Sequence, residues 1–196
     1  MLRVDARDGD VSPEILDACR RGDRDALRTL YEAYKDRVYS IAFYFFHGDA
    51  GAAGDVTQQV FLKLIDGMAK YRGDAAFSTW LYRIVVNACV DRSRRWRAEA
   101  PIEPAALDAI AARAVSHEDV LVRGEVARSV QEAIATLPPR LRLPILLRYF
   151  DELSYAEMAA ALNCSIGTVS SRLSRAHQQL ARKLAPVVDG APRVKR

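Results

Sequence analysis

Residues 154–180, SYAEMAAALNCSIGTVSSRLSRAHQQL, contain the strongest structural signal in the chain. Ser154 and Glu157 form a capping box, in which the serine oxygen and the glutamate carboxylate each accept a backbone N–H at the start of a helix. The polar run Asn163-Cys164-Ser165 favours a turn, after which Ser165 can cap a second helix. The pattern therefore predicts a helix-turn-helix.

The second helix of this unit has one apolar and one polar face. Its apolar residues fall within about 80° of arc, a narrow stripe that faces a core. The stripe consists of Ile166, Val169, Leu173, Ala176 and Leu180. His177 points toward the same side and is predicted to pack there. The candidate DNA-binding residues of the polar face and its flanks are Ser165, Thr168, Ser171, Arg172, Arg175 and Gln178.

These six residues suit the major groove of DNA. Short hydroxyl side chains allow close approach of the backbone, arginines reach phosphates or guanine edges, and the amide of Gln178 can pair with a base. No acidic residue occurs from Met158 to Val188, which is unusual on a solvated helix. The alternative is a plain helical hairpin that faces solvent.

The rest of the chain also has helical periodicity, without an alternating run typical of a strand. Helices are expected within residues 12–46 (two helices), 55–71, 78–97, 118–135, 140–150 and 154–185 (two helices). Pro144 lies inside one of them and should kink it. The sequence thus predicts an all-α fold.

Residues 99–117 separate two groups of predicted helices. This segment has two prolines, several alanines and few large apolar side chains, so it is predicted to be a flexible acidic linker. The expected organisation is a first helical domain at 12–98, the linker at 99–117 and a second helical domain at 118–186.

Charge is distributed unevenly, although the formal net charge is only +4. Residues 70–98 hold seven bases and two acids, and residues 140–185 hold seven bases and three acids. The intervening residues 99–139 hold three bases and seven acids. Two basic zones separated by an acidic one suit contact with a polyanion at two places. Ordinary solvated helix faces are the alternative.

The first basic zone combines aromatic and cationic side chains. Aromatic rings stack on the bases of single-stranded nucleic acid while arginines follow its phosphates, so the zone is a candidate nucleic-acid site. The candidate residues are Tyr71, Arg72, Phe77, Ser78, Thr79, Trp80, Arg83, Asn87, Arg92, Arg94 and Arg95. Alternatively, Phe77 and Trp80 close the core of the first domain with part of their surface.

One face of the helix predicted from Asp55 is polar except for a single leucine. Asp55, Gln58, Gln59, Leu62 and Asp66 fall within about 100° of arc. An apolar side chain inside a polar patch suits docking of a partner protein, although single exposed leucines are also common.

Cysteine and histidine usage argues against a secreted, metal-binding or redox protein. Cys19, Cys89 and Cys164 are far apart and odd in number, which favours reduced thiols in a cytoplasmic protein. No pair of Cys or His has metal-ligand spacing, so no metal or other cofactor is expected. The longest apolar run, Val38–Phe46, is too short to insert into a membrane, since a spanning helix needs about 20 residues.

Three segments, in this order, resemble the extracytoplasmic-function (ECF) sigma factors of bacterial RNA polymerase. They are DVTQQVFLKL at 55–64, YRGDAAFSTWLYRIVVNACVDRSRR at 71–95, and LPPRLRLPILLRYFDELSYAEMAAALNCSIGTVSSRLSRAHQQL at 137–180. The resemblance covers roughly residues 14–185. It implies a region 2 and a region 4 domain that bind the β′ and β subunits of core RNA polymerase. It also implies recognition of the −10 and −35 promoter elements and regulation by an anti-sigma factor.

The resemblance implies a role for each candidate surface. The polar patch around Leu62 matches the family's surface for the β′ coiled coil. Residues 71–79 match the loop that captures an extruded −10 base, which is base flipping without chemistry. The helix from Trp80 to Arg95 matches the one that meets the upstream edge of the −10 duplex, and Ser165–Gln178 matches the −35 recognition helix. The acidic linker matches the segment that threads the polymerase channels.

Two other classes of protein fit parts of the pattern. A helix-turn-helix repressor or a response-regulator output domain fits residues 154–180 but leaves residues 71–97 unexplained. A nucleic-acid enzyme would need a carboxylate or metal cluster, and the paired acids of this chain have no histidine or third acid nearby. The sequence therefore predicts a promoter-specific transcription initiation factor that is not an enzyme.

Overall fold

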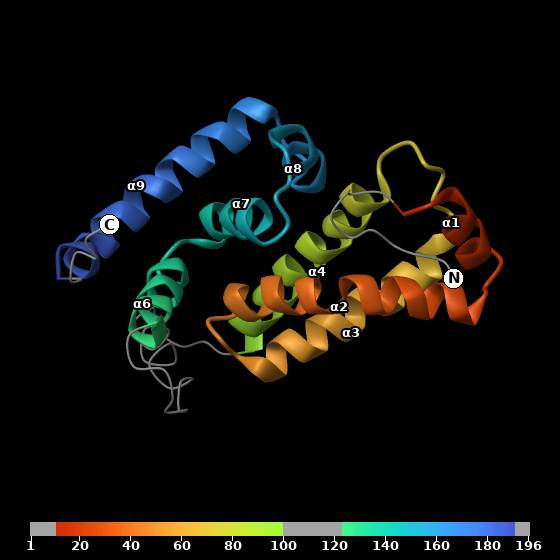
Figure 1. Ribbon diagram of the computed structural model, residues 1–196, viewed down its shortest axis with the longest axis horizontal. Helices are drawn as coiled ribbons and strands as arrows, with labels where there is room; N and C mark the ends of the chain where they lie inside the picture. The colour runs from red at the N-terminus through yellow and green to blue at the C-terminus, as the bar shows by residue number, and fades with distance from the viewer. Residues whose placement is uncertain (1–10, 100–122, 191–196) are drawn as a thin grey trace.

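The computed structural model describes residues 11–99 and 123–190 (Figure 1). Within those residues it has eight α-helices and no strand, which confirms the predicted all-α fold. The helices are α1 (Pro13–Arg20), α2 (Arg24–Phe45), α3 (Ala50–Met68), α4 (Phe77–Glu99), α6 (Arg123–Ala135), α7 (Pro139–Phe150), α8 (Tyr155–Ala161) and α9 (Ile166–Gly190). Almost all of the predicted linker lies outside the described residues.

Side-chain caps determine where several of these helices begin. Asp23 caps α2 by accepting two backbone N–H groups at 2.9 Å each. Asp49 accepts the Ala52 N–H at 2.9 Å, so α3 begins at Ala50 rather than at the predicted Asp55. Residues 50–54, which lie outside the helices predicted from the sequence, are therefore helical, because the cap offsets the low helix propensity of their two glycines.

Helix α7 continues without a break through Pro144. A proline lacks the N–H that would bond to the carbonyl four residues earlier, here that of Arg140 in the first turn. Arg140 is exposed and lies in the first turn of α7, so the lost bond is at the end of the helix. The predicted helix at 140–150 therefore forms despite the proline.

The helices form two groups that pack against each other (Figure 1). In the first group α2 packs on α1 and α3, and α3 packs on α4; in the second, α6, α7 and α8 all pack on α9. Between the groups, α2 contacts α6 and α7, and α4 contacts α8. Buried residues of both groups join in one apolar cluster, so the two groups are in contact in addition to being linked along the chain.

Helix α4 lies between the groups because it is apolar on two sides. Leu81 and Val85 are fully buried on the side that faces the first group. Tyr82 and Val86, on the other side, are only 2% and 6% exposed. The hydroxyl of Tyr82 donates to Asp151, so this second side faces the second group.

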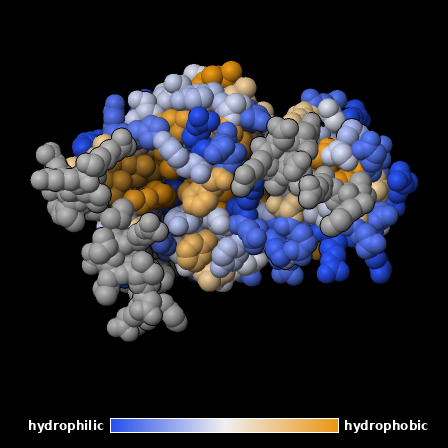
Figure 2. Space-filling model, viewed as in Figure 1, coloured by the Kyte–Doolittle hydropathy of each residue, from blue (hydrophilic) through white to orange (hydrophobic). Residues whose placement is uncertain are grey.

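The described part of the face shown in Figure 2 is mostly hydrophilic, with apolar side chains in patches. The large apolar or aromatic residues that stay exposed in the described part of the chain are Tyr31, Tyr39, Leu62, Ile65, Tyr149, Tyr155 and Ile166. Leu62 and Ile65 are both on α3, and Leu62 belongs to the docking face predicted from the sequence.

Candidate nucleic-acid interface

Helices α8 and α9 form the predicted helix-turn-helix. Ser154 Oγ accepts the Glu157 N–H at 3.3 Å, and the Glu157 carboxylate accepts the Ser154 N–H at 2.8 Å, which completes the capping box. The turn contains Asn163 with a φ of 49°, a left-handed conformation that asparagine adopts more readily than most residues. Ser165 Oγ then accepts the Thr168 N–H at 3.1 Å and caps α9.

The apolar stripe of α9 faces the core, with one exception. Val169, Leu173 and Ala176 are at most 2% exposed, and Leu180 packs at the edge of the core. Ile166 is 54% exposed. Helical side chains lean toward the helix N-terminus, so the first residue of α9 extends over the preceding turn instead of the core.

His177 packs on a neighbouring helix at the surface rather than in the core. Its ring meets the Tyr149 ring edge-on, with the centroids 5.9 Å apart. Its Nε2 lies 3.0 Å from the Tyr149 hydroxyl. The pair joins α9 to α7, so His177 packs as predicted, but at an exposed position and not in the core as expected.

The opposite face of α9 presents the predicted DNA-binding residues. The exposed ones are Ser165, Ser171, Arg175 and Gln178, and the half-buried ones are Thr168 and Arg172. Arg172 leans back toward the turn, since its Nη1 lies 3.9 Å from Cys164 Sγ. Arg175, nearly one turn further on, is exposed, so the two arginines of this face have different surroundings.

The loop between α3 and α4 exposes its middle and buries its ends. Residues 72–76 are all exposed, whereas Tyr71 is 9% and Phe77 0% exposed. The Tyr71 hydroxyl donates to the Ala75 carbonyl at 2.7 Å and so closes the loop on itself. Gly73 has a φ of 80°, which few other residues adopt without strain. The part of the loop open to a ligand is therefore 72–76.

Phe77, a predicted stacking residue, is a core side chain in this structure. Its ring lies 5.7 Å from that of Tyr34 on α2 and 5.9 Å from that of Trp80, so it fills the space between α2 and α4. Ser78 and Thr79 are 8% and 7% exposed. The three residues are inaccessible to a base here, because the first turn of α4 faces inward.

Trp80 is half-buried, in keeping with a partial core role. A Cβ at Gly67 of α3 would lie 3.0 Å from the Trp80 ring, so the two helices need a glycine there to approach so closely. The Trp80 ring also lies 5.0 Å from the Tyr71 ring. Trp80 is therefore only partly covered by the core.

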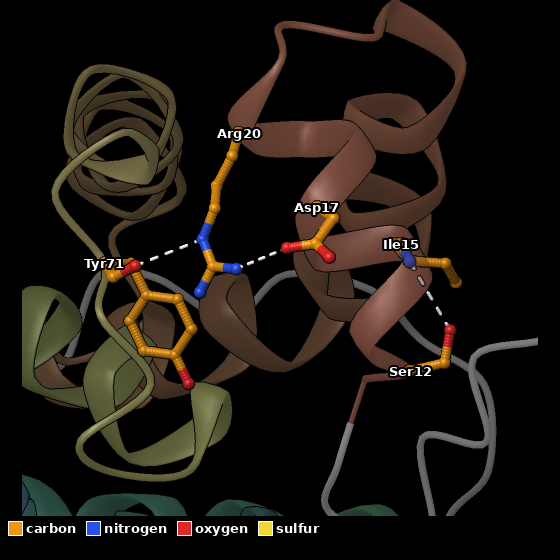
Figure 3. A network of polar contacts seen from close by, with 5 residues as sticks. All are labelled: Ser12, Ile15, Asp17, Arg20 and Tyr71. Atoms are coloured by element: carbon orange, nitrogen blue, oxygen red, sulfur yellow. Dashed lines mark hydrogen bonds and ion pairs between the residues drawn. The ribbon is translucent and has the colours of Figure 1, made fainter.

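An arginine that the sequence analysis did not single out holds the start of this loop (Figure 3). Arg20, the last residue of α1, donates from Nε to the Tyr71 carbonyl at 3.1 Å. Its guanidinium carbon lies 5.4 Å from the centre of the Tyr71 ring, and its Nη1 donates to Asp17 at 2.5 Å. Arg20 and Tyr71 are 51 residues apart, so no local pattern reveals the contact.

Beyond the loop, α4 presents a polar and cationic line. The predicted residues that are exposed on it are Arg83, Asn87, Arg94 and Arg95. Arg92 is half-buried, and its guanidinium carbon lies 5.9 Å from the centre of the Trp96 ring. Asp91, the acid within this line, pairs with Lys63 of α3 at 3.7 Å. The line is thus predominantly positive, which suits a phosphate backbone.

The predicted partner-docking face of α3 is exposed and more apolar than expected. Asp55 and Gln58 are exposed and Gln59 is half-buried. Leu62 is 56% exposed, and Ile65, which is not among the residues predicted for this face, is 48% exposed. The face therefore offers two adjacent aliphatic side chains beside polar ones.

A buried carboxylate links the two helix groups. Asp151, after α7, accepts a hydrogen bond from the Tyr82 hydroxyl of α4 and lies 3.5 Å from Arg37 Nη1 of α2. Burial raises the pKa of Asp151, because desolvation outweighs the hydrogen bond from Tyr82 and the charge of Arg37. Burial also raises the pKa of Tyr82 well above its usual value, so this phenol remains a donor.

A buried guanidinium makes the second polar link. Arg142 of α7 is 4% exposed and lies 3.0 Å from His47 Nε2, between α2 and α3. A guanidinium has only donors, so His47 accepts with a neutral ring. Burial lowers the pKa of Arg142 to about 10, which still leaves it charged at neutral pH. Arg142 also donates to the backbone carbonyls of Phe45, Ile134, Ala135 and Leu137.

The cysteines have structural surroundings. Burial raises the pKa of Cys19 to about 11 and that of Cys89 to about 12, so neither forms a thiolate at neutral pH. Cys164 is half-buried, and all three thiols are free. Among the described residues no group of three or more His, Cys, Asp or Glu side chains could hold a metal ion. Nor is any helix in that part of the chain long and apolar enough to cross a bilayer.

Comparison with known proteins assigns both helix groups to one family. The family model for sigma-70 region 2 matches residues 30–99, and that for sigma-70 region 4 matches residues 127–180. The RNA polymerase sigma-H factor of Pseudomonas aeruginosa is 34% identical over 183 residues, or 89% of this chain and 94% of that protein. The ECF RNA polymerase sigma factor SigW of Bacillus subtilis is 31% identical over 84% of this chain and 92% of that protein.

Solved structures show the same fold. CnrH, in complex with the cytosolic domain of CnrY, has a TM-score of 0.66 and 23% identity over 95% of this chain and 100% of CnrH. The sigma factor RpoE of Bartonella quintana, in complex with the anti-sigma factor NepR, has a TM-score of 0.63 and 20% identity over 81% of this chain and 96% of RpoE.

The chain therefore belongs to the sigma-70 family and to its ECF group. It is a promoter-specific transcription initiation factor, the kind of subunit that acts with core RNA polymerase on promoter DNA. Sigma factors of this family are not enzymes, which agrees with the class of protein predicted from the sequence.

Proposed function

We propose that this sigma factor contacts promoters through two surfaces: α9 recognises the −35 element, and α4 with the loop at 72–76 recognises and opens the −10 element. The supporting observation is that one chain has two separate exposed cationic surfaces, of which one is on a helix-turn-helix. A repressor with the same helix-turn-helix would need only one cationic surface. The chain acts in the cytoplasm, where template and polymerase are.

The surroundings of the two arginines on α9 suggest different tasks. Arg175 is exposed near the centre of the polar face, where a bidentate contact with guanine is possible. Arg172 lies at the flank and leans toward Cys164, closer to where a phosphate would pass.

Replacing Arg175 with alanine is expected to cost about 1–3 kcal/mol of binding and to relax the preference at one base pair of the −35 element. Replacing Arg172 with alanine should weaken binding to every −35 sequence and flatten the salt dependence by about one unit of slope. Titration of a −35 duplex library at several salt concentrations measures both effects. Equal losses on every sequence for both variants would contradict the assignment.

With its two helix groups packed together as in this structure, the chain cannot bind the −35 and −10 promoter elements at the same time. The −35 and −10 elements are centred about 25 base pairs apart, or roughly 80 Å along B-DNA at 3.4 Å per base pair. Helix α4 contacts α8, and the 25 residues of α9 span only about 37 Å. The two groups must therefore separate when the factor engages a whole promoter.

The exposed face of α3 is the surface that we assign to the β′ subunit of core polymerase. Its chemistry is that of a docking surface, with Leu62 and Ile65 surrounded by Asp55, Gln58 and Gln59. The match with sigma-70 region 2 supports this assignment.

Replacing Leu62 with aspartate is expected to weaken binding to core polymerase by more than tenfold, since a buried leucine contributes about 1.5–3 kcal/mol. The melting temperature should hardly change, because Leu62 is 56% exposed in the free chain. Competition against a labelled sigma factor for core polymerase measures the affinity, and Leu62→Met, which keeps the apolar contact, is the control. Unchanged affinity in Leu62→Asp would place the docking surface elsewhere.

Run-off transcription tests the proposed function directly. Core RNA polymerase with this chain should give specific transcripts from a subset of a promoter library, whereas core polymerase alone should give none. Specific DNA binding by the chain without any transcript would favour the repressor class instead.

An anti-sigma factor is the partner that we propose for regulation. The structurally similar RpoE of Bartonella quintana is in complex with the anti-sigma factor NepR, and the two folds match over most of both chains. Co-purification of this chain with the product of a neighbouring gene, followed by inhibition of the run-off reaction by that product, tests this proposal.

A further inference from the structure

The loop at 72–76 is a short exposed segment whose position depends on its two ends. At its far end the fully buried Phe77 begins α4. At its near end the Tyr71 ring is buried and its hydroxyl holds the Ala75 carbonyl at 2.7 Å. The backbone carbonyl of Tyr71, just after α3, accepts the Arg20 Nε–H from α1.

Arg20 makes two contacts with Tyr71 (Figure 3). Its Nε hydrogen bond of 3.1 Å fixes the Tyr71 carbonyl, and its guanidinium packs over the Tyr71 ring at 5.4 Å. Asp17 holds the other edge of the guanidinium at 2.5 Å, so the arginine is itself oriented. Contact with the Tyr71 carbonyl, the Tyr71 ring and the Asp17 carboxylate at the same time depends on the planar guanidinium and its several donors, which lysine lacks.

We propose that Arg20 is a positioning residue for base capture: it fixes the exit of the chain from α3 and so presents the loop at 72–76 in one preformed shape. The inference rests on the proposed function of that loop. A preformed loop loses less conformational entropy when a base enters it, so binding of the correct base is favoured over loose encounters.

The rest of α1 does not depend on this arginine. Ile15, Leu16 and Cys19 bury the helix against the first group, at 0%, 8% and 3% exposure. The side chain of Arg20 is about one-third exposed. Loss of Arg20 should therefore loosen the loop and leave α1 in place.

Backbone ¹⁵N relaxation of the full chain tests the positioning itself. The variant is Arg20→Met. The matched control is Arg21→Met, because Arg21 is the next residue, is exposed, and its substitution removes the same charge. Order parameters of the amides at 72–76 should be near 0.8 in the wild type and in Arg21→Met, and should fall below about 0.6 in Arg20→Met. Order parameters that stay equal in the two variants would overturn the proposal.

The functional arm uses core polymerase with each full-length variant and fork-junction DNA that has each of the four bases at the extruded −10 position. Arg20→Met should reduce discrimination between the best and worst base about tenfold, a factor that corresponds to 1.4 kcal/mol. Affinity for a −35 duplex and for core polymerase should stay within twofold of wild type. A uniform loss on all four bases, or a loss in Arg21→Met of the same size, would mean that Arg20 acts through charge or stability and would overturn the inference.

A loop variant separates this inference from the function on which it rests. Arg72→Ala with Asp74→Ala alters the exposed loop directly and should also lower base discrimination. If this double variant discriminates like wild type, the capture role of the loop is wrong, while the relaxation experiment still judges whether Arg20 orders the loop. If the double variant loses base discrimination and Arg20→Met does not, only the role proposed for Arg20 is wrong.

Discussion

Replacing Arg142 with methionine is expected to lower the free energy of unfolding by about 3–5 kcal/mol, among the largest effects of any single polar substitution in this chain. For a chain of this size the melting temperature should fall by roughly 10 °C. The methionine keeps the length and the apolar stem of the side chain, so the loss comes from the missing donors and not from a cavity.

The physical reason is that Arg142 satisfies buried backbone acceptors from two places in the chain. It donates to carbonyls around the end of α6 and to the Phe45 carbonyl, whose position at the C-terminus of α2 favours a cation. A buried acceptor left without a donor costs about 1–3 kcal/mol. Lysine should restore little of the stability, since one ammonium cannot reach acceptors on opposite sides of a guanidinium.

Arg140→Met is the matched control, because Arg140 is on the same helix, loses the same charge and is exposed. Its stability should stay within about 0.5 kcal/mol of wild type. Thermal and urea unfolding followed by circular dichroism compares the two variants. Similar melting temperatures in Arg142→Met and Arg140→Met would show that the buried network contributes nothing net to stability.

Short-range signals were sufficient for the helix-turn-helix. The capping box of Ser154 and Glu157 and the stripe of Val169, Leu173 and Ala176 involve residues within two helical turns of one another. Both are confirmed, because the forces that form them act between near neighbours in the sequence. The predicted start of α3 at Asp55 was wrong, because a single cap at Asp49 begins the helix at Ala50 despite the glycines that follow.

Contacts between distant segments were beyond the reach of the sequence. Arg142 and Phe45 are 97 residues apart, and Tyr82 and Asp151 are 69 residues apart. Periodicity places a residue on a face but does not identify the helix that covers that face. Arg142 was therefore counted in the second basic zone, whereas it is buried and contributes nothing to a DNA-facing surface.

The aromatic loop shows the limit of a prediction that is made from residue types alone. An aromatic beside arginines fits base stacking and core closure equally well, and the sequence left both roles open for Phe77 and Trp80. The structure buries Phe77 completely and Trp80 in part, because the rings of Tyr34 and Tyr71 already form the pocket that they fill. The exposed segment 72–76 is the part of the loop that we propose contacts DNA.

Replacing Phe77 with alanine should therefore unfold or loosen the first helix group, at a cost of about 3–5 kcal/mol. Phe77 is 0% exposed and packs against aromatic rings on both sides, so truncation leaves a large cavity. Transcription by core polymerase should fall on duplex promoters and should not recover on a template with a pre-opened −10 bubble, because the defect precedes melting.

The double variant Arg72→Ala with Asp74→Ala is expected to behave in the opposite way. Both residues are exposed, so the melting temperature should stay within about 2 °C of wild type, which corresponds to less than about 1 kcal/mol. Permanganate reactivity at the −10 element should appear more slowly, and the pre-opened bubble should restore transcription, because unstacking a base costs a few kcal/mol that the loop no longer offsets. If instead Phe77→Ala melts like wild type and is rescued by the bubble, Phe77 leaves the core to stack on a promoter base, and the division between core ring and capture loop is wrong.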